Sequence, residues 1–282
     1  FCRILGYEII DQNLFYMPTQ DKSLTDNLSI HGKKSITLPL GEITVSRKAK
    51  ALTVIFRSCT SVNMLTQNKK RLFDKEKSEY TLRSLNSIIK SIKYVNNDIP
   101  KLDINIIIVD HDSKEEILEK MRNLLEKSHI ENSMISLNIN EFIGGIRKIN
   151  QKKEKVTTKQ MSNMANIHKS LIIAKNKCED LIYFVEDDYI HQKESIHEMI
   201  FTYERISSIV KKELILCPAD YPYLYTKSEP ANIFLGNSRH WRSVDETLCT
   251  FFTSKKMIVN YWDKYTSMCK FEHYPFESPM HE

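Results

Sequence analysis

The sequence predicts an α/β protein in which a mostly parallel sheet is flanked by helices, with a small N-terminal appendage before it. Two observations predict this class. Short aliphatic and β-branched runs, such as Leu52–Phe56 and Leu181–Val185, are typical of strands buried on both faces of a sheet. These runs alternate with segments whose apolar residues recur every three or four positions, as in amphipathic helices. This alternation favours parallel strands joined by crossover helices.

The composition fits a globular protein and excludes several other classes. Of 282 residues, 41% are hydrophobic and 27% are charged, with 6 Gly and 8 Pro, which excludes a collagenous or mainly disordered chain. The net charge of +5 is spread along the chain; it is compatible with anionic substrates and does not predict nucleic-acid binding. The 6 cysteines form no C-x-x-C pair, so we expect reduced thiols. No aliphatic run is long enough to cross a bilayer, and we expect a cytoplasmic protein with at most peripheral membrane contact.

The expected elements follow in order after the appendage, residues 1–50, which is polar and irregular apart from a plausible hairpin around Gly41. Strands are expected at Leu52–Phe56, Ile104–Val109, Met134–Ile139 and Leu181–Val185. Helices are expected between them, at Glu79–Val95, Lys114–Glu126 and Asn163–Asn176. Asp112 or Ser113 is suited to cap the second of these helices.

Polar groups follow three of the expected strands, at the ends where sheets of this class bind ligands. They are Arg57-Ser58, the turn Asp110–Ser113, and the run Glu186-Asp187-Asp188. Three adjacent carboxylates after an apolar strand repel one another, and a divalent cation such as Mn²⁺ or Mg²⁺ would neutralise them. A solvated acidic loop is the alternative interpretation.

The order of these elements resembles the GT-A fold glycosyltransferases, especially the family-2-like enzymes that use nucleotide sugars. The resemblance rests on four segments in the family's order, Tyr80–Ile88, Ile108–Ser113, Met164–Ala174 and Leu181–Tyr189, the last of which takes the place of the family's D-x-D motif. It covers residues 51–200 well and the remainder loosely. It implies one GT-A domain over residues 51–282, with a nucleotide-sugar-binding half (51–190) and an acceptor-binding half (191–282).

The resemblance also implies roles for residues in the first half. Asp110 matches the aspartate that accepts a hydrogen bond from the nucleotide base. Arg57 and Ser58 match the loop that lines the nucleotide pocket, although the family's usual Pro-Thr-Tyr-Asn is missing there. Asp112 and Asp187 are expected to contact the nucleotide sugar. Glu186 and Asp188 match the outer carboxylates of D-x-D and are the expected metal ligands.

In the second half, the resemblance implies a carboxylate base for the acceptor hydroxyl and a late histidine on the metal. The family's usual Glu-Asp pair is absent, so the candidate bases are Asp245, Glu277 and Glu282, each of which has a solvated surface carboxylate as its alternative. His240 is the candidate metal ligand. Beside it, Trp241 is suited to stack on a sugar ring and Arg242 to bind a phosphate.

The expected function is therefore metal-dependent transfer of a sugar from a nucleotide-diphosphate sugar, with UDP as the expected nucleotide. The acceptor would be a hydroxyl of a glycan, a glycoconjugate or a lipid-linked molecule, and a carboxylate base would make the reaction inverting. Two alternatives remain open: a non-catalytic module that binds nucleotides or carbohydrates, and a nucleotidyltransferase. The absence of Gly from Arg57–Ser61 counts against the nucleotidyltransferase.

Overall fold

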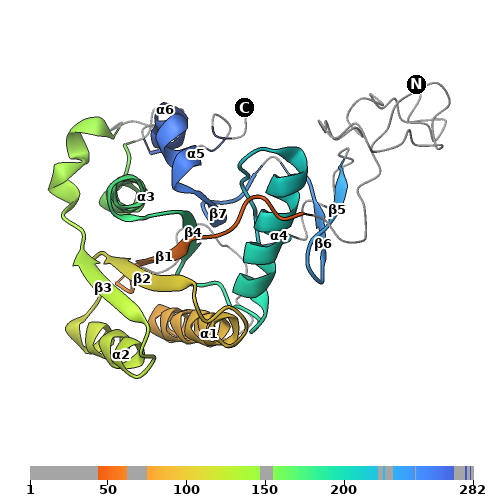
Figure 1. The fold of residues 1–282 in the computed structure, drawn as a ribbon. Coiled ribbons are helices and arrows are strands. Elements are labelled where there is room, and N and C mark those ends of the chain that lie inside the picture. Colours follow the sequence, from red (N-terminus) through yellow and green to blue (C-terminus); the bar gives the residue numbers. More distant parts are fainter. Residues whose placement is uncertain are drawn as a thin grey trace, which may run out of the picture.

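The computed structural model describes residues 44–61, 75–146, 155–221, 225, 231–244, 246–269, 277 and 280. Its central sheet has five strands in the order β3-β2-β1-β4-β7 (Figure 1). They are β1 (Ala51–Ser58), β2 (Asp103–Asp110), β3 (Glu131–Ser136), β4 (Leu181–Glu186) and β7 (Phe251–Ser254). The first four run parallel, and β7 runs antiparallel to β4. The predicted α/β class with a mostly parallel sheet is confirmed.

Helices cover both faces of this sheet (Figure 1). On one face lie α1 (Lys77–Asp98), α2 (Glu115–Glu126) and α4 (Ser195–Val210). On the other lie α3 (Thr158–Lys177), α5 (Lys255–Asn260) and α6 (Trp262–Ser267). Two short 3₁₀ helices, η3 (Ile139–Glu141) and η4 (Ile143–Gly145), follow β3, and a hairpin of β5 (Ile233–Leu235) and β6 (His240–Arg242) lies beside α4.

The sheet separates two apolar cores because successive side chains of a strand point to opposite faces. In β1, Leu52, Val54 and Phe56 pack with α1, α2 and α4, whereas Ile55 packs with α3, α5 and α6. All eight residues of β1 are buried, which explains why the central strands read as unbroken aliphatic runs. The core therefore holds the carboxyl ends of β1, β2 and β4 rigidly at one edge of the sheet.

Two local expectations were wrong. The third strand spans Glu131–Ser136 rather than Met134–Ile139. Among the described strands β3 lies at the edge of the sheet and pairs with β2 alone, and its polar first half is exposed. The predicted side-chain cap of α2 is also absent, since the N-cap position is Lys114. The hydroxyl of Ser113 instead donates to the side chain of Asp110, 2.6 Å away.

Residues 1–43 of the expected appendage, including its hairpin, lie outside the described residues. The last residues before β1 lie on the domain itself. The backbone N–H groups of Ser46 and Arg47 donate to Ser208 Oγ on α4 (3.0 and 2.9 Å). The Arg47 guanidinium also binds the carboxylates of Asp180 and Glu213. The segment from residue 44 to β1 is thus attached to α4 and to the start of β4.

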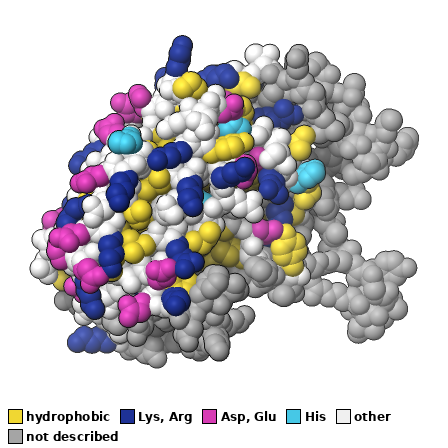
Figure 2. Space-filling view, turned by 90° about the horizontal axis from the view of Figure 1, so that it is seen from below, with side chains coloured by type: hydrophobic (Ala, Val, Ile, Leu, Met, Phe, Trp, Pro, Cys, Tyr) yellow, Lys and Arg dark blue, Asp and Glu magenta, His cyan; other side chains and the backbone are white. Residues whose placement is uncertain are grey.

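The surface seen from below, where α1 and α2 lie, mixes basic and acidic side chains over most of its area (Figure 2). No broad area of a single charge is visible on this face, in agreement with the small net charge of +5. Toward the side where the β5–β6 hairpin lies, basic, histidine and hydrophobic side chains stand next to one another. Among the described residues, no helix has both the length and the apolar character needed to span a membrane.

Candidate active site at the carboxyl edge of the sheet

The strand order reverses at β1, which has β2 on one side and β4 on the other. The chain runs outward from β1 to β2 and β3, then returns through α3 to β4 on the opposite side. In open α/β sheets, the crevice outside the carboxyl ends of the strands at such a reversal is where ligands bind. Arg57 and Glu186 are paired in register across this point, and Ser58 is paired with Asp110 on the other side.

Arg57 forms a salt bridge with Glu186 at the reversal, with 2.7 Å between Nη2 and Oε1. The Arg57 side chain is 5% exposed and that of Glu186 is 33% exposed, so water reaches the carboxylate but hardly the guanidinium. Burial by itself lowers the pKa of Arg57, but the charge of Glu186 opposes this and the pKa is raised overall. Burial raises the pKa of Glu186, while the charge of Arg57 works against that rise.

Asp187 turns inward and ties three segments together. Lys77 Nζ lies 3.0 Å from Asp187 Oδ1, while Thr81 Oγ1 and the backbone N–H of Cys59 donate to Oδ2 at 2.9 and 3.2 Å. Burial by itself lowers the pKa of Lys77, but Asp187, with a contribution from Asp188, raises it above its ordinary value. Lys77 therefore stays protonated at the first turn of α1.

Asp110 is buried and organises the two loops that follow β1 and β2. Ser58 Oγ and Ser113 Oγ each donate to Asp110 Oδ1 at 2.6 Å, and the Ser113 N–H donates to Oδ2 at 3.2 Å. The Thr60 N–H in turn donates to Ser113 Oγ (3.0 Å). Asp112, in the same turn, is exposed and has a left-handed backbone, with φ of 58°. Two hydroxyl groups thus hold the Asp110 carboxylate in place at the sheet edge.

A strained loop approaches the same edge from the C-terminal half. Leu248 and Cys249 both have left-handed backbones, with φ of 49° and 60°, which costs about 1–2 kcal/mol for each non-glycine residue. The buried carboxylate of Glu277 accepts the N–H groups of Thr247 and Leu248 (2.8 and 2.9 Å) and also that of Cys249. The Cys249 carbonyl then accepts a hydrogen bond from Arg57 Nη2 (3.4 Å). Glu277 therefore stabilises the loop that contacts Arg57.

These contacts bear on the predicted metal site. The carboxylates of Glu186 and Asp187 are compensated by Arg57 and Lys77, so the repulsion that argued for a cation is relieved by the chain itself. Among the residues that the structure describes, no three His, Cys, Asp or Glu side chains lie together in an arrangement that would hold a metal ion. Metal dependence therefore stays a prediction.

The structure brings some of the predicted site residues together and places others elsewhere. Those gathered at the carboxyl edge of β1, β2 and β4 are Arg57, Ser58, Asp110, Glu186 and Asp187. Asp188 follows directly on the chain and has contacts of its own. Asp245 and Glu282 lie outside the described residues. Glu277 lies behind the loop after β6, with its oxygens engaged by backbone donors.

Sequence reasoning missed Lys77, Thr81 and Asn163. Asn163 Oδ1 accepts from Arg57 Nη1 at 3.5 Å, and Lys77 and Thr81 bind Asp187. Lys77 precedes the helix that the apolar pattern predicts, and α1 begins two residues earlier than expected, at Lys77. Because Lys77 lies outside that apolar pattern, the sequence contained no signal that singled it out.

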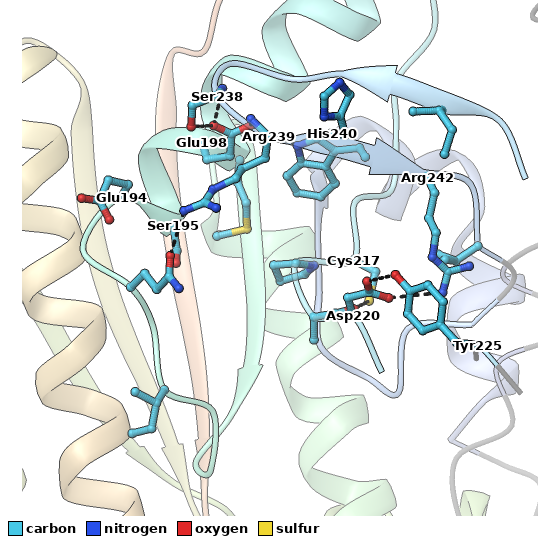
Figure 3. Close-up of a pocket in the computed structure, with 18 residues that line it drawn as sticks. Glu194, Ser195, Glu198, Cys217, Asp220, Tyr225, Ser238, Arg239, His240 and Arg242 are labelled. Carbon is cyan, nitrogen blue, oxygen red and sulfur yellow. Dashed lines mark hydrogen bonds and ion pairs between the residues drawn. The ribbon is translucent and has the colours of Figure 1, made fainter. Parts of the chain in front are cut away.

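A pocket of about 650 Å³ lies between the start of α4, residues 217–220 and the β5–β6 hairpin. Ile190 and Gln192 line it, and they follow Asp188 closely in the chain. Figure 3 shows Arg239, His240 and Arg242 succeeding one another along the hairpin side of the pocket. His240 thus lies in this pocket, whose lining includes neither Glu186 nor Asp188.

No protein-family model and no curated protein matches the sequence. Two solved structures of LgtC resemble parts of the chain. An active-site mutant of LgtC is 12% identical, with a TM-score of 0.26, over 48% of this chain and 37% of that chain. The galactosyltransferase LgtC in complex with donor and acceptor sugar analogs is 13% identical, with the same TM-score of 0.26 and the same coverage of 48% and 37%. The matched region thus spans little more than a third of the LgtC chain.

Proposed function

We propose that the protein is a glycosyltransferase that moves a sugar from a nucleotide-diphosphate sugar to an acceptor hydroxyl. The observation that carries the proposal is the set of groups at the strand-order reversal: Arg57 and Lys77 as cations, and Asp110 as a buried acceptor held by Ser58 and Ser113. A nucleotide diphosphate needs positive charge for its phosphates and a fixed acceptor for the donors of its base or ribose. Both kinds of group occur here, at the ends of β1 and β2 and at the start of α1.

In the proposed reaction the acceptor oxygen forms a bond to the anomeric carbon while the bond from that carbon to the β-phosphate oxygen breaks. Charge develops on the departing diphosphate, and nearby cations in a site with little water stabilise it. Arg57 and Lys77 would supply that charge. Each would keep its carboxylate partner, Glu186 or Asp187, and also bind a phosphate oxygen. The acceptor hydroxyl proton passes to a carboxylate base, for which Asp245 and Glu282 remain the proposed candidates.

The test is calorimetric titration of the full chain with UDP and UDP-glucose, with and without Mn²⁺ or Mg²⁺. Asp110→Asn should weaken UDP binding by about tenfold or more, the size expected when a charged hydrogen-bond acceptor is lost. Asp103→Asn is the matched control, because Asp103 is exposed at the opposite end of the same strand. Circular dichroism of both variants checks that they fold.

The same experiment separates the alternatives. Release of UDP from UDP-glucose, followed by mass spectrometry of the sugar product, supports the transferase. UDP binding without any release or transfer indicates a non-catalytic binding module, and pyrophosphate release from a nucleoside triphosphate indicates a nucleotidyltransferase. Equal UDP affinity of the Asp110→Asn variant and the parent protein would refute the assignment of the nucleotide site. A requirement for Mn²⁺ or Mg²⁺ would support the predicted metal dependence.

A further inference from the structure

The pocket beside the β5–β6 hairpin has features of a ligand site. The groups at the strand-order reversal, Arg57, Lys77 and Asp110, do not account for them. Its volume of about 650 Å³ lies inside the range of about 300–1,000 Å³ that is usual for small-molecule sites. Its lining combines aromatic, aliphatic and cationic side chains from three separate segments of the chain (Figure 3). None of the groups proposed to bind the nucleotide at the strand-order reversal belongs to that lining.

The hairpin wall of the pocket is held rigidly by one buried carboxylate. Glu198 of α4 accepts hydrogen bonds from the backbone N–H groups of Asn237 and Ser238 (3.0 and 2.8 Å) and from Trp241 Nε1 (3.1 Å). Burial by itself raises the pKa of Glu198, but these donors lower it below its ordinary value, so the carboxylate stays charged. Because the polar atom of Trp241 is already bound to Glu198, the indole ring is what Trp241 offers to a ligand in the pocket.

The pocket also contains one cation that no described carboxylate pairs with, although three carboxylates belong to the same lining. The Arg239 guanidinium donates to the neutral side-chain oxygen of Gln192 (3.1 Å), and no described carboxylate lies within ion-pair distance of it. Arg242 binds Asp220 through Nη2 (3.2 Å) and lies 5.0 Å from the ring centre of Tyr225. Its Nε atom is buried without a hydrogen-bond partner among the described residues.

The apolar part of the lining is unusually open to solvent. Of the large hydrophobic side chains in the described ranges, the three most exposed are Ile190 (63%), Ile233 (64%) and Tyr225 (67%), and all three line this pocket. Hydrophobic side chains that gather in one place on a surface mark an interaction site more often than scattered ones do. Here they line the same pocket as Arg239.

We propose that this pocket binds an acidic saccharide, whose ring packs on Trp241 and Tyr225 and whose carboxylate or phosphate binds Arg239. A sugar ring has an apolar C–H face that suits an aromatic wall and hydroxyls that suit the polar atoms around it. The Arg239 fork is matched to a planar carboxylate or to two phosphate oxygens. If the pocket is the acceptor site of the transferase, that role rests on the proposed function. The binding of an acidic saccharide does not depend on it.

The binding test uses the fluorescence of Trp241 in the full chain, in a Trp262→Phe background that leaves Trp241 as the one tryptophan. The probes are glucuronic acid, glucose 6-phosphate, glucose and inorganic phosphate. We expect both acidic sugars to bind at least about tenfold more tightly than glucose, as one charge-assisted pair allows. Whether the carboxylate or the phosphate is preferred follows from the first two probes.

Arg239→Gln should reduce the affinity for the acidic sugars about tenfold and bring it near that for glucose. Arg122→Gln is the matched control, since it also removes one positive charge but from an exposed position on α2, far from the hairpin (Figure 1). It should leave all four affinities unchanged. A thermal unfolding scan of each variant shows whether the protein remains folded.

Four outcomes would overturn the inference: no change in fluorescence with any probe, no gain in affinity over glucose for either acidic sugar, phosphate binding without any gain from the sugar, or acid-sugar binding that Arg239→Gln does not weaken. Binding to phosphatidylglycerol vesicles with no sugar binding would also overturn it, in favour of a membrane surface. Failure of the proposed transferase is seen separately, in UDP titrations of the Asp110→Asn variant. Acid-sugar binding without UDP binding would uphold the pocket and refute the nucleotide site.

Discussion

Arg57 and Glu186 face each other across the point where the strand order reverses, with 2.7 Å between their charged atoms. Their strands are neighbours in the sheet, and the two residues are paired in register at its carboxyl edge. One partner is 5% exposed and the other is 33% exposed, so a solute that enters this edge from water meets the carboxylate first. The pair is thus a structural element of the sheet edge, with its carboxylate on the side that water reaches.

Removing one member of this pair should destabilise the protein. Arg57→Met leaves Glu186 partly buried without its cation, and we expect a loss of about 2–3 kcal/mol, less than for a fully buried pair because Glu186 keeps some contact with water. Urea unfolding measures the change. Arg57→Met combined with Glu186→Gln should cost less than the sum of the two single changes.

Arg83→Met is the control for that cycle. Arg83 also forms a carboxylate pair, with Glu79 at 2.7 Å, but the side chains of both residues are well exposed on α1. Its loss should cost no more than about 0.5 kcal/mol. A similar loss for Arg57→Met and Arg83→Met would mean that the pair at the strand reversal has no special role in stability.

Gly236 is the hairpin residue that admits no side chain. A Cβ placed there would lie 2.5 Å from both Glu198 Oε1 and Trp241 Nε1. Gly236→Ala should therefore displace the hairpin, cost about 1–3 kcal/mol and shift the emission of Trp241. Thermal unfolding and fluorescence measure the two effects.

Gly144→Ala is the matched control for this change, because a Cβ at Gly144 would meet nothing within 4 Å. It should be close to neutral in both measurements. An unchanged Trp241 emission in the Gly236→Ala variant would contradict the close packing of hairpin and α4.

His191 should make the protein sensitive to acid. Its Nε2 lies 2.8 Å from the Tyr183 hydroxyl and its Nδ1 3.2 Å from Ser87 Oγ, and burial lowers the pKa of His191 to about 4. The unfolded chain binds a proton near pH 6.5, so the folded state loses stability as the pH falls from about 6.5 to 4. Above about pH 6.5 the contribution of His191 to the stability of the folded state is complete.

Urea unfolding of the His191→Gln variant and the parent protein at several pH values measures this effect. The difference in unfolding free energy between the two should shrink as the pH falls through that window. His129→Asn is the control, because His129 is exposed and asparagine tolerates its left-handed backbone, with φ of 59°. A constant difference between His191→Gln and parent across the window would show that His191 does not titrate as described.

Glu277→Gln should loosen the loop at residues 247–249. The amide NH₂ that replaces one carboxylate oxygen would face the backbone donors that Glu277 now accepts, and leaving a buried donor unpaired costs about 1–3 kcal/mol. Cys249 is buried in that loop, so mass spectrometry should find faster modification of its thiol by iodoacetamide.

Glu179→Gln, at an exposed position before β4, should change neither the stability nor the modification rate. If Glu277 were the catalytic base instead, Glu277→Gln would abolish sugar transfer while leaving the thiol as protected as in the parent protein. That result would contradict the positioning role described for Glu277.

The sequence by itself determined the class of fold and the edge where the site lies. The runs Leu52–Phe56, Ile104–Val109 and Leu181–Val185 are aliphatic because both faces of each strand are covered, and this local property is visible without a structure. Arg57, Asp110 and Glu186 follow such runs directly, so their place at the strand ends could be predicted as well. Their partners could not.

Only the tertiary structure decided which groups compensate the acidic run. Arg57 meets Glu186 through the register of two strands that are far apart in the chain, and Lys77 meets Asp187 through the packing of α1. In the same way, the contact of Glu198 with Trp241 depends on how the hairpin packs against α4. The sequence pattern of three adjacent carboxylates favoured a metal, because it shows the charges and not the cations that approach from elsewhere. Electrostatic energy depends on distances in space, and those arise only when the chain is folded.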